Sequence, residues 1–301
     1  MNNGKVHWEG NMPAIVTPFA ADGTIDERKF AENIEWLMAQ GVSGAVVTGC
    51  TGEAWAVTDD EKLHLFRLAA QAAKGRITVI GGTGSIVTSH VTALSRAAKE
   101  TGIDGVMVLP PYYAMPTRRE IVAHYRAISD GARVPIMVYN IPSRTGINLT
   151  PDIMDQLAGI DFVVALKESH DDFVQLEETV ARVGDRIRVF SGFAAVRAVA
   201  AIVMGCAGLV SSMDAHLMGR EAISLYALSK AGEIDKARAI QQRALSLVEN
   251  LHRLGSEASV LKGAMNLIGR PGGHVRPPLL DLVGEDLEKV RAVLSTHGFS
   301  V

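Results

Sequence analysis

Short apolar runs alternate along the chain with longer amphipathic segments, and this alternation is the strongest pattern in the sequence. The short runs are apolar at successive positions rather than at every second one, which is typical of parallel strands that are covered on both faces. Eight such runs predict eight strands, at residues 12–17, 44–48, 77–80, 105–109, 135–139, 162–167, 187–190 and 208–211.

The segments between the predicted strands have helical periodicity. Asp26 and Thr58 stand where N-caps are expected, and Glu61 gives Thr58 the spacing of a capping box. Gly41 and Gly75 follow two of these segments, as glycines that end helices do. The first four predicted helices span residues 26–40, 58–74, 87–101 and 117–131.

Eight strand–helix units without a break in composition predict a closed (β/α)8 TIM barrel of the α/β class. An open, doubly wound sheet is the alternative. After the eighth strand only helices follow, so we predict a barrel over residues 1–225 and a C-terminal helical appendage over residues 226–301. The helices expected beyond the eighth strand span residues 215–231, 233–251, 257–268 and 284–297.

The chemistry of such a barrel takes place at the C-terminal ends of its strands, and two residues there attract attention. Lys167 ends the sixth predicted strand, where burial would lower its pKa and provide the free amine that attacks a carbonyl. Tyr139 ends the preceding strand, about 4.8 Å away in a sheet, and a phenol there can shuttle protons. The pair favours Schiff-base catalysis. Alternatively, Lys167 reaches solvent or pairs with Glu168, and Tyr139 is a core aromatic residue.

Two further groups are suited to binding carboxylates. The Gly49–Glu53 turn precedes a helix and offers backbone N–H groups and the Thr51 hydroxyl, although it could equally be a tight turn alone. Arg144 follows the fifth predicted strand and offers a guanidinium fork for a second carboxylate; the alternative is an ordinary surface arginine. Cys50, within the turn, is interpreted as a small buried thiol rather than a nucleophile.

The composition excludes several classes of protein. Thirty lysine and arginine residues against 33 aspartate and glutamate residues give a net charge of −3, and the absence of a basic block argues against nucleic-acid binding. Apolar stretches are too short to span a membrane, and Met1–Trp8 lacks the apolar core of a signal peptide. Two isolated cysteines suit a reducing compartment. We therefore predict a cytoplasmic protein with a small-molecule substrate, no metal and no cofactor.

Three motifs at the predicted strand ends resemble the dihydrodipicolinate synthase / N-acetylneuraminate lyase family of class I Schiff-base aldolases. They are Gly49-Cys50-Thr51-Gly52-Glu53, the segment from Tyr139 to Gly146, and Leu166-Lys167-Glu168. The likeness runs in order along nearly the whole chain. It implies a (β/α)8 barrel with a C-terminal helical domain, assembled as a homotetramer built from two dimers.

The resemblance also implies roles for individual residues. Lys167 would form the Schiff base and Tyr139 would transfer protons, while Thr51 and its neighbours Cys50 and Gly52 would hold the carboxylate of pyruvate. The resemblance further suggests that Tyr113 reaches the active site of a neighbouring subunit, that Arg144 lies near the carboxylate of an aldehyde substrate, and that the backbone of Val210 borders the lysine.

The chain departs from the synthases at two places. Cys50 replaces a threonine of the proton relay, and a thiol is a weaker hydrogen-bonding group. Phe193 follows Ser191-Gly192 where synthases often have an acidic residue. Arg144 favours a dihydrodipicolinate synthase-like condensation of pyruvate with aspartate semialdehyde. A catabolic aldolase, dehydratase or deaminase acting on a 2-oxo acid is the alternative, whereas a scaffold that only binds a 2-oxo acid would not need both Lys167 and Tyr139.

Overall fold

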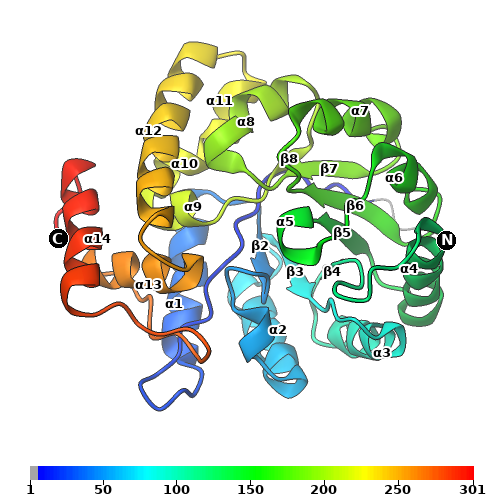
Figure 1. The fold of residues 1–301 in the computed structure, drawn as a ribbon, viewed down its shortest axis with the longest axis horizontal. Coiled ribbons are helices and arrows are strands. Elements are labelled where there is room, and N and C mark those ends of the chain that lie inside the picture. Colours follow the sequence, from blue (N-terminus) through cyan, green and yellow to red (C-terminus); the bar gives the residue numbers. More distant parts are fainter. Residues whose placement is uncertain (1–5) are drawn as a thin grey trace.

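Eight parallel strands surrounded by helices form the centre of the computed structural model, which describes residues 6–301 (Figure 1). The strands follow the order β1-β8-β7-β6-β5-β4-β3-β2, and a parallel bridge between Ala14 and Val46 joins the two ends of this sheet. The predicted (β/α)8 barrel is therefore confirmed. The strands are β1 (Gly10–Asn11), β2 (Gly44–Val47), β3 (Thr78–Gly82), β4 (Gly105–Val108), β5 (Ile136–Asn140), β6 (Val163–Glu168), β7 (Arg188–Ser191) and β8 (Gly208–Leu209).

The first strand differs from its prediction at residues 12–17, because the regular strand covers only Gly10–Asn11. Pro13 has no N–H group and cannot donate to a regular ladder. The segment nevertheless pairs on both sides. Met12 N donates to Leu209 O at 2.9 Å on one side, and Val46 N donates to Pro13 O at 2.9 Å on the other. An irregular segment thus closes the barrel.

The predicted helix caps are present in the structure. The Asp26 side chain accepts a hydrogen bond from Lys29 N, and Thr58 and Glu61 form the predicted capping box. Gly41 ends the first helix in the left-handed conformation. The helices around the barrel are α1 (Glu27–Gln40), η1 (Ala54–Ala56), α2 (Asp59–Ala73), α3 (Thr88–Lys99), α4 (Arg118–Ala132), α5 (Pro142–Thr145), α6 (Pro151–Leu157), α7 (Phe173–Val183) and α8 (Ala194–Val203).

The helix predicted at residues 215–231 is wrong as a single element. Gly219 adopts φ 58° and ψ −129°, a conformation outside the helical region, and separates short helices. The last of them, α11 (Leu225–Lys230), packs against α8 and β1. The helices after β8 are α9 (Met213–Met218), α10 (Arg220–Ile223), α11 (Leu225–Lys230), α12 (Ile234–His252), α13 (Glu257–Leu267) and α14 (Gly284–Thr296).

The C-terminal helices α12, α13 and α14 lie along one side of the barrel in Figure 1, and α12 packs against α8 of the barrel. Leu247, Leu261 and Val290 from these three helices form a second apolar core, which also includes Val16 and Ala195 from the barrel. This core fixes the appendage to the barrel and brings the beginning of α13 close to the ends of the strands.

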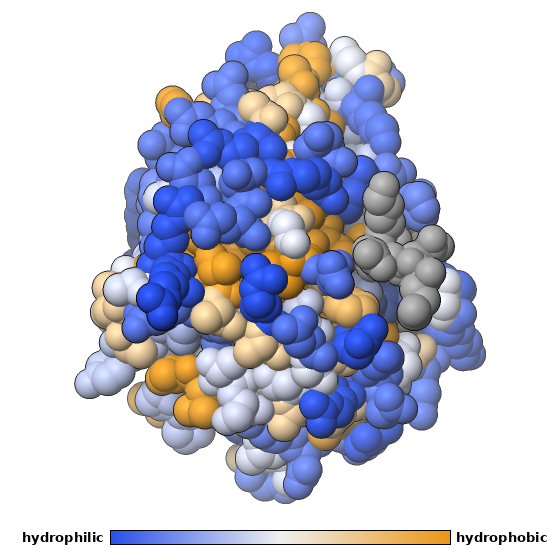
Figure 2. Space-filling view, turned by 90° about the vertical axis from the view of Figure 1, so that its right-hand side faces the viewer, coloured by the Kyte–Doolittle hydropathy of each residue, from blue (hydrophilic) through white to orange (hydrophobic). Residues whose placement is uncertain are grey.

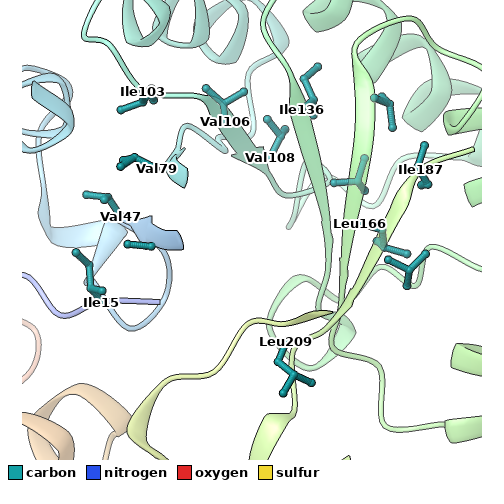
Figure 3. Close-up of a cluster of buried hydrophobic side chains, with 14 of the residues drawn as sticks. Ile15, Val47, Val79, Ile103, Val106, Val108, Ile136, Leu166, Ile187 and Leu209 are labelled. Atoms are coloured by element: carbon teal, nitrogen blue, oxygen red, sulfur yellow. The ribbon is translucent and has the colours of Figure 1, made fainter. Parts of the chain in front are cut away.

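Side chains of the strands alternate between two apolar layers. Outward residues from successive strands pack with helix residues in one large cluster, as the labelled side chains from Ile15 to Leu209 in Figure 3 illustrate. Met137, Ala165 and Phe190 belong to a separate cluster inside the barrel. Because neighbours in a strand point to opposite faces, Tyr139 and Lys167 share the inward direction of Met137 and Ala165. The pleat therefore directs both side chains into the barrel.

The surface mixes polar and apolar regions. Figure 2 shows the side on which α4 and α6 lie in Figure 1, where hydrophobic residues gather centrally and hydrophilic residues border them. None of the helices between residues 6 and 301 has the length and apolar character required to cross a membrane. The prediction about a signal peptide depends in part on residues 1–5, which lie outside the described residues.

Candidate active site

Lys167 and Tyr139 meet at the mouth of the barrel. They are direct register partners on the adjacent strands β6 and β5, and the Lys167 Nζ atom lies 4.1 Å from the centre of the Tyr139 ring. Both side chains are buried, and both line a cavity of about 450 Å³. The pair predicted from two strand ends is therefore brought into contact over a single cavity.

The surroundings of Lys167 make its ammonium easier to deprotonate than that of an exposed lysine. Burial lowers the pKa of Lys167 from its ordinary value of 10.5, because an ammonium loses hydration there. Glu168 does not pair with it: its carboxylate accepts hydrogen bonds from Asn140 Nδ2 at 2.9 Å and from His170 N at 2.7 Å. Within residues 6–301 Lys167 forms no ion pair. Burial also raises the pKa of Tyr139 well above 10, so its phenol is protonated and can act as a proton donor.

Space for the lysine depends on Gly192, whose importance the sequence did not indicate. A Cβ atom at this position would lie 1.9 Å from Ser169 Oγ and 3.1 Å from Lys167 Cε. Any side chain at residue 192 would therefore push on the stem of the lysine. The close approach of Gly192 to Lys167 results from the pairing of β7 with β6, so it cannot be recognised from the sequence alone.

The turn after β2 has unusual backbone geometry. Thr48 and Glu53 both have positive φ values, 53° and 54°, which cost energy in residues other than glycine. The Thr17 hydroxyl donates to Gly52 O at 2.8 Å and helps to hold the turn. Within residues 6–301 the backbone N–H groups of Cys50 and Thr51 donate to no other group. Two free donors at the cavity fit the predicted carboxylate seat.

The same turn is anchored by the C-terminal appendage. Lys262 from α13 is fully buried; its ammonium donates to Glu53 and to the carbonyls of Thr17, at 2.6 Å, and His274, at 2.7 Å. The other Glu53 oxygen accepts a hydrogen bond from Arg276 N at 3.0 Å. Glu53 thus links the turn to two parts of the appendage.

We expect Lys262→Met to destabilise the fold by about 3–5 kcal/mol, because it leaves the Glu53 carboxylate buried without its cation. Urea unfolding followed by circular dichroism measures the loss. Lys289→Met, which removes only exposed ion pairs, should cost less than about 1 kcal/mol. The double variant Lys262→Met/Glu53→Gln should recover part of the loss, and equal small effects of both single variants would contradict the buried anchor.

A residue that the sequence did not single out, Glu257, enters the site from the beginning of α13. Its carboxylate accepts hydrogen bonds from Ser212 Oγ at 3.0 Å and Arg144 Nη2 at 3.2 Å, and lies 3.3 Å from Thr51 Oγ1. Arg144 and Glu257 both line the cavity of Lys167. The predicted guanidinium fork is therefore at the mouth, but it already has a carboxylate partner.

The other predicted site residues occupy different environments. Cys50 and Val210 line the Lys167 cavity, and Val210 N donates to Ser191 O at 2.8 Å. Gly52 permits the tight turn, because a Cβ there would lie 2.9 Å from Ile15 O. Tyr113 is 88% exposed and does not line this cavity, so its role remains a prediction. Among residues 6–301 no group of three or more histidine, cysteine, aspartate or glutamate residues is arranged to hold a metal.

The closed barrel with a buried lysine and a tyrosine at adjacent strand ends is typical of lyases of the class I aldolase type. Comparisons with known proteins agree. Residues 7–297 match the Dihydrodipicolinate synthetase family. The chain is 37% identical to an "Uncharacterized DapA-like lyase" of Rhizobium meliloti, with 95% of this chain and 96% of the relative covered. It is 34% identical to the 4-hydroxy-tetrahydrodipicolinate synthase of Trichlorobacter lovleyi, with 96% and 99% covered.

Solved structures point the same way. The pyruvate complex of the chloride-inhibited dihydrodipicolinate synthase from Acinetobacter baumannii superposes with a TM-score of 0.91 at 28% identity, covering 97% of this chain and 99% of that chain. The chain belongs to the dihydrodipicolinate synthetase family. It is accordingly an enzyme, a lyase of the class I aldolase type that acts on small molecules.

Proposed function

We propose that this chain binds pyruvate or a related 2-oxo acid as a Schiff base on Lys167. The observation that carries the proposal is a buried lysine amine, free of any ion pair within residues 6–301, 4.1 Å from the ring of Tyr139. The pyruvate bound in the Acinetobacter baumannii relative supports the same substrate class.

The proposed chemistry starts with attack of the Lys167 amine on carbon 2 of the 2-oxo acid. A C–N bond forms, a proton passes from nitrogen to oxygen, and a second proton allows that oxygen to leave as water, which gives an iminium. Loss of a proton from carbon 3 gives an enamine that can attack an aldehyde. The new alkoxide takes a proton, and water then hydrolyses the iminium and frees the amine. Tyr139 is the proposed carrier of these protons.

The substrate carboxylate is proposed to lie on the free N–H groups of Cys50 and Thr51. Gly52 permits the tight turn, and Cys50, Thr51 and Val210 line the same cavity. Cys50 would contribute its backbone here, since its thiol is a weak hydrogen-bonding group.

Two classes of second substrate remain candidates. Condensation with aspartate semialdehyde is supported by Arg144 at the cavity and by relatives named 4-hydroxy-tetrahydrodipicolinate synthase. A catabolic reaction of a longer 2-oxo acid, by cleavage, dehydration or deamination, is supported by Glu257, which already pairs with Arg144.

The assembly implied by the resemblance and the location predicted from the composition are proposals too. A homotetramer of two dimers would give Tyr113 a neighbouring subunit to contact, and the 88% exposure of Tyr113 in the single chain supports this arrangement. A cytoplasmic location is proposed from the composition, together with a site that needs no cofactor.

Reduction with cyanoborohydride in the presence of pyruvate should attach one reduced three-carbon unit per chain, mapped by peptide mass spectrometry to Lys167. The initial rate of labelling should rise with pH, because only the neutral amine attacks. The rise should level off below pH 10.5, because burial lowers the pKa of Lys167 from that value. Labelling of another lysine, or none with any 2-oxo acid, would contradict the proposal.

A further inference from the structure

At the mouth of the cavity, the Glu257 carboxylate occupies the place beside Arg144 where the sequence predicted a substrate carboxylate. Glu257 Oε2 accepts from Arg144 Nη2 at 3.2 Å, while Oε1 lies 3.0 Å from Ser212 Oγ and 3.3 Å from Thr51 Oγ1. Its side chain is 24% exposed, and it lines the same cavity as Lys167. Residues from three separate parts of the chain thus converge on one carboxylate.

A purely structural role for Glu257 explains little of this geometry. An acidic residue in the first turn of a helix interacts favourably with the helix dipole wherever its side chain points. The Glu257 carboxylate instead turns away from α13 toward Thr51, Ser212 and Arg144, all of which line the cavity. Its position is therefore suited to contact with a bound substrate.

Charge determines which substrates this arrangement accepts. A second carboxylate placed on Arg144 would lie beside the Glu257 carboxylate, and like charges at such distances repel, although water at the 45% exposed Arg144 side chain screens part of this repulsion. An ionised carboxylate only accepts hydrogen bonds, with room for several donors. A hydroxyl group on the substrate can donate to Glu257 without disturbing its pair with Arg144.

We propose that Glu257 is a specificity-determining residue that selects substrates carrying hydroxyl groups, and no second carboxylate, beyond the pyruvate carbons. The inference rests on the proposed Schiff base on Lys167. In the direction of synthesis, the enamine carbon attacks the carbonyl carbon of a hydroxylated neutral aldehyde, and the aldehyde oxygen takes a proton to become a hydroxyl. In the opposite direction, the same C–C bond breaks and the proton returns.

The test compares condensation of pyruvate with glyceraldehyde, which is hydroxylated and neutral, and with succinate semialdehyde, which carries a carboxylate. Wild-type enzyme should have the higher kcat/KM for glyceraldehyde. Glu257→Gln should lower that value about tenfold, and it should raise kcat/KM for succinate semialdehyde by about tenfold to a hundredfold, the range of one charge-assisted hydrogen bond. A loss of structure alone would lower both values together.

Glu178→Gln is the control, because Glu178 is exposed on α7, lies outside the cavity and, within residues 6–301, makes no ion pair. It should leave the ratio of the two kcat/KM values unchanged. A wild-type preference for succinate semialdehyde or aspartate semialdehyde would overturn the inference, as would an unchanged ratio in Glu257→Gln. The preference of the wild-type enzyme between the two kinds of aldehyde tests the inference even if Glu257→Gln fails to fold.

Pyruvate labelling of Lys167 separates this inference from the proposed function. If wild-type enzyme is labelled on Lys167 but prefers the aldehydes that carry a carboxylate, only the role of Glu257 is wrong. If no 2-oxo acid labels Lys167, the proposed function itself fails.

Discussion

Replacement of Lys167 by arginine should abolish both the pyruvate adduct and turnover. Arginine keeps the positive charge, but it does not deprotonate to a usable nucleophile at any pH that the protein tolerates. Peptide mass spectrometry after cyanoborohydride treatment measures the adduct, and a coupled assay of pyruvate release or consumption measures turnover. The expected loss is complete because Lys167 is the single lysine among the residues that line the cavity in the described part of the chain.

The fold of this variant needs a check, because arginine is larger than lysine and Lys167 is buried. Lys167→Met has a similar length without charge and should also lose the adduct while keeping the circular dichroism spectrum of the wild type. Lys62→Met is the matched control, since Lys62 is another buried lysine whose pKa is lowered by burial. It should still be labelled at Lys167. An adduct that survives in Lys167→Met would assign the chemistry elsewhere.

The general fold could be predicted from the sequence because each strand and helix has a local signature. Apolar runs mark the strands, and the Thr58 capping box marks a helix end by contacts within one turn. The errors arose where tertiary contacts decide the conformation. The first strand reduces to Gly10–Asn11 because Pro13 interrupts it, yet closure of the barrel keeps the segment paired on both sides.

The site could be predicted in part for the same reason. Lys167 and Tyr139 end adjacent strands, so the order of strands alone brings them together. Glu257 and Lys262 lie far from them in the sequence, and only packing of α13 against the barrel places both residues at the turn after β2. No local pattern marks a glutamate in the first turn of a distant helix as part of an active site.

These distant contacts connect the appendage to the chemistry. Lys262 fixes the turn that offers the free N–H groups, and Glu257, five residues earlier in the same helix, faces the cavity. One helix therefore supports the turn with one side chain and borders the substrate with another. The strained backbone of Glu53 persists because Lys262 and the Arg276 N–H hold its carboxylate in place.

Replacement of Tyr139 by phenylalanine should lower kcat by about 10²–10⁴-fold, the usual contribution of one general acid–base group. Binding of pyruvate should weaken far less, because the ring that lies beside Lys167 remains and the carboxylate seat on Cys50 and Thr51 is untouched. Steady-state kinetics measure the first effect, and the pyruvate concentration needed for half-maximal labelling of Lys167 measures the second.

Tyr125→Phe controls for the loss of a buried hydroxyl. Tyr125 is fully buried, and its hydroxyl donates to Val108 O at 2.9 Å, outside the Lys167 cavity. This variant should lose about 1 kcal/mol of stability and keep its kcat. If Tyr139→Phe behaved in the same way, with reduced stability and normal turnover, Tyr139 would be a core residue. Water or another side chain would then have to carry the protons that formation and hydrolysis of the Schiff base require.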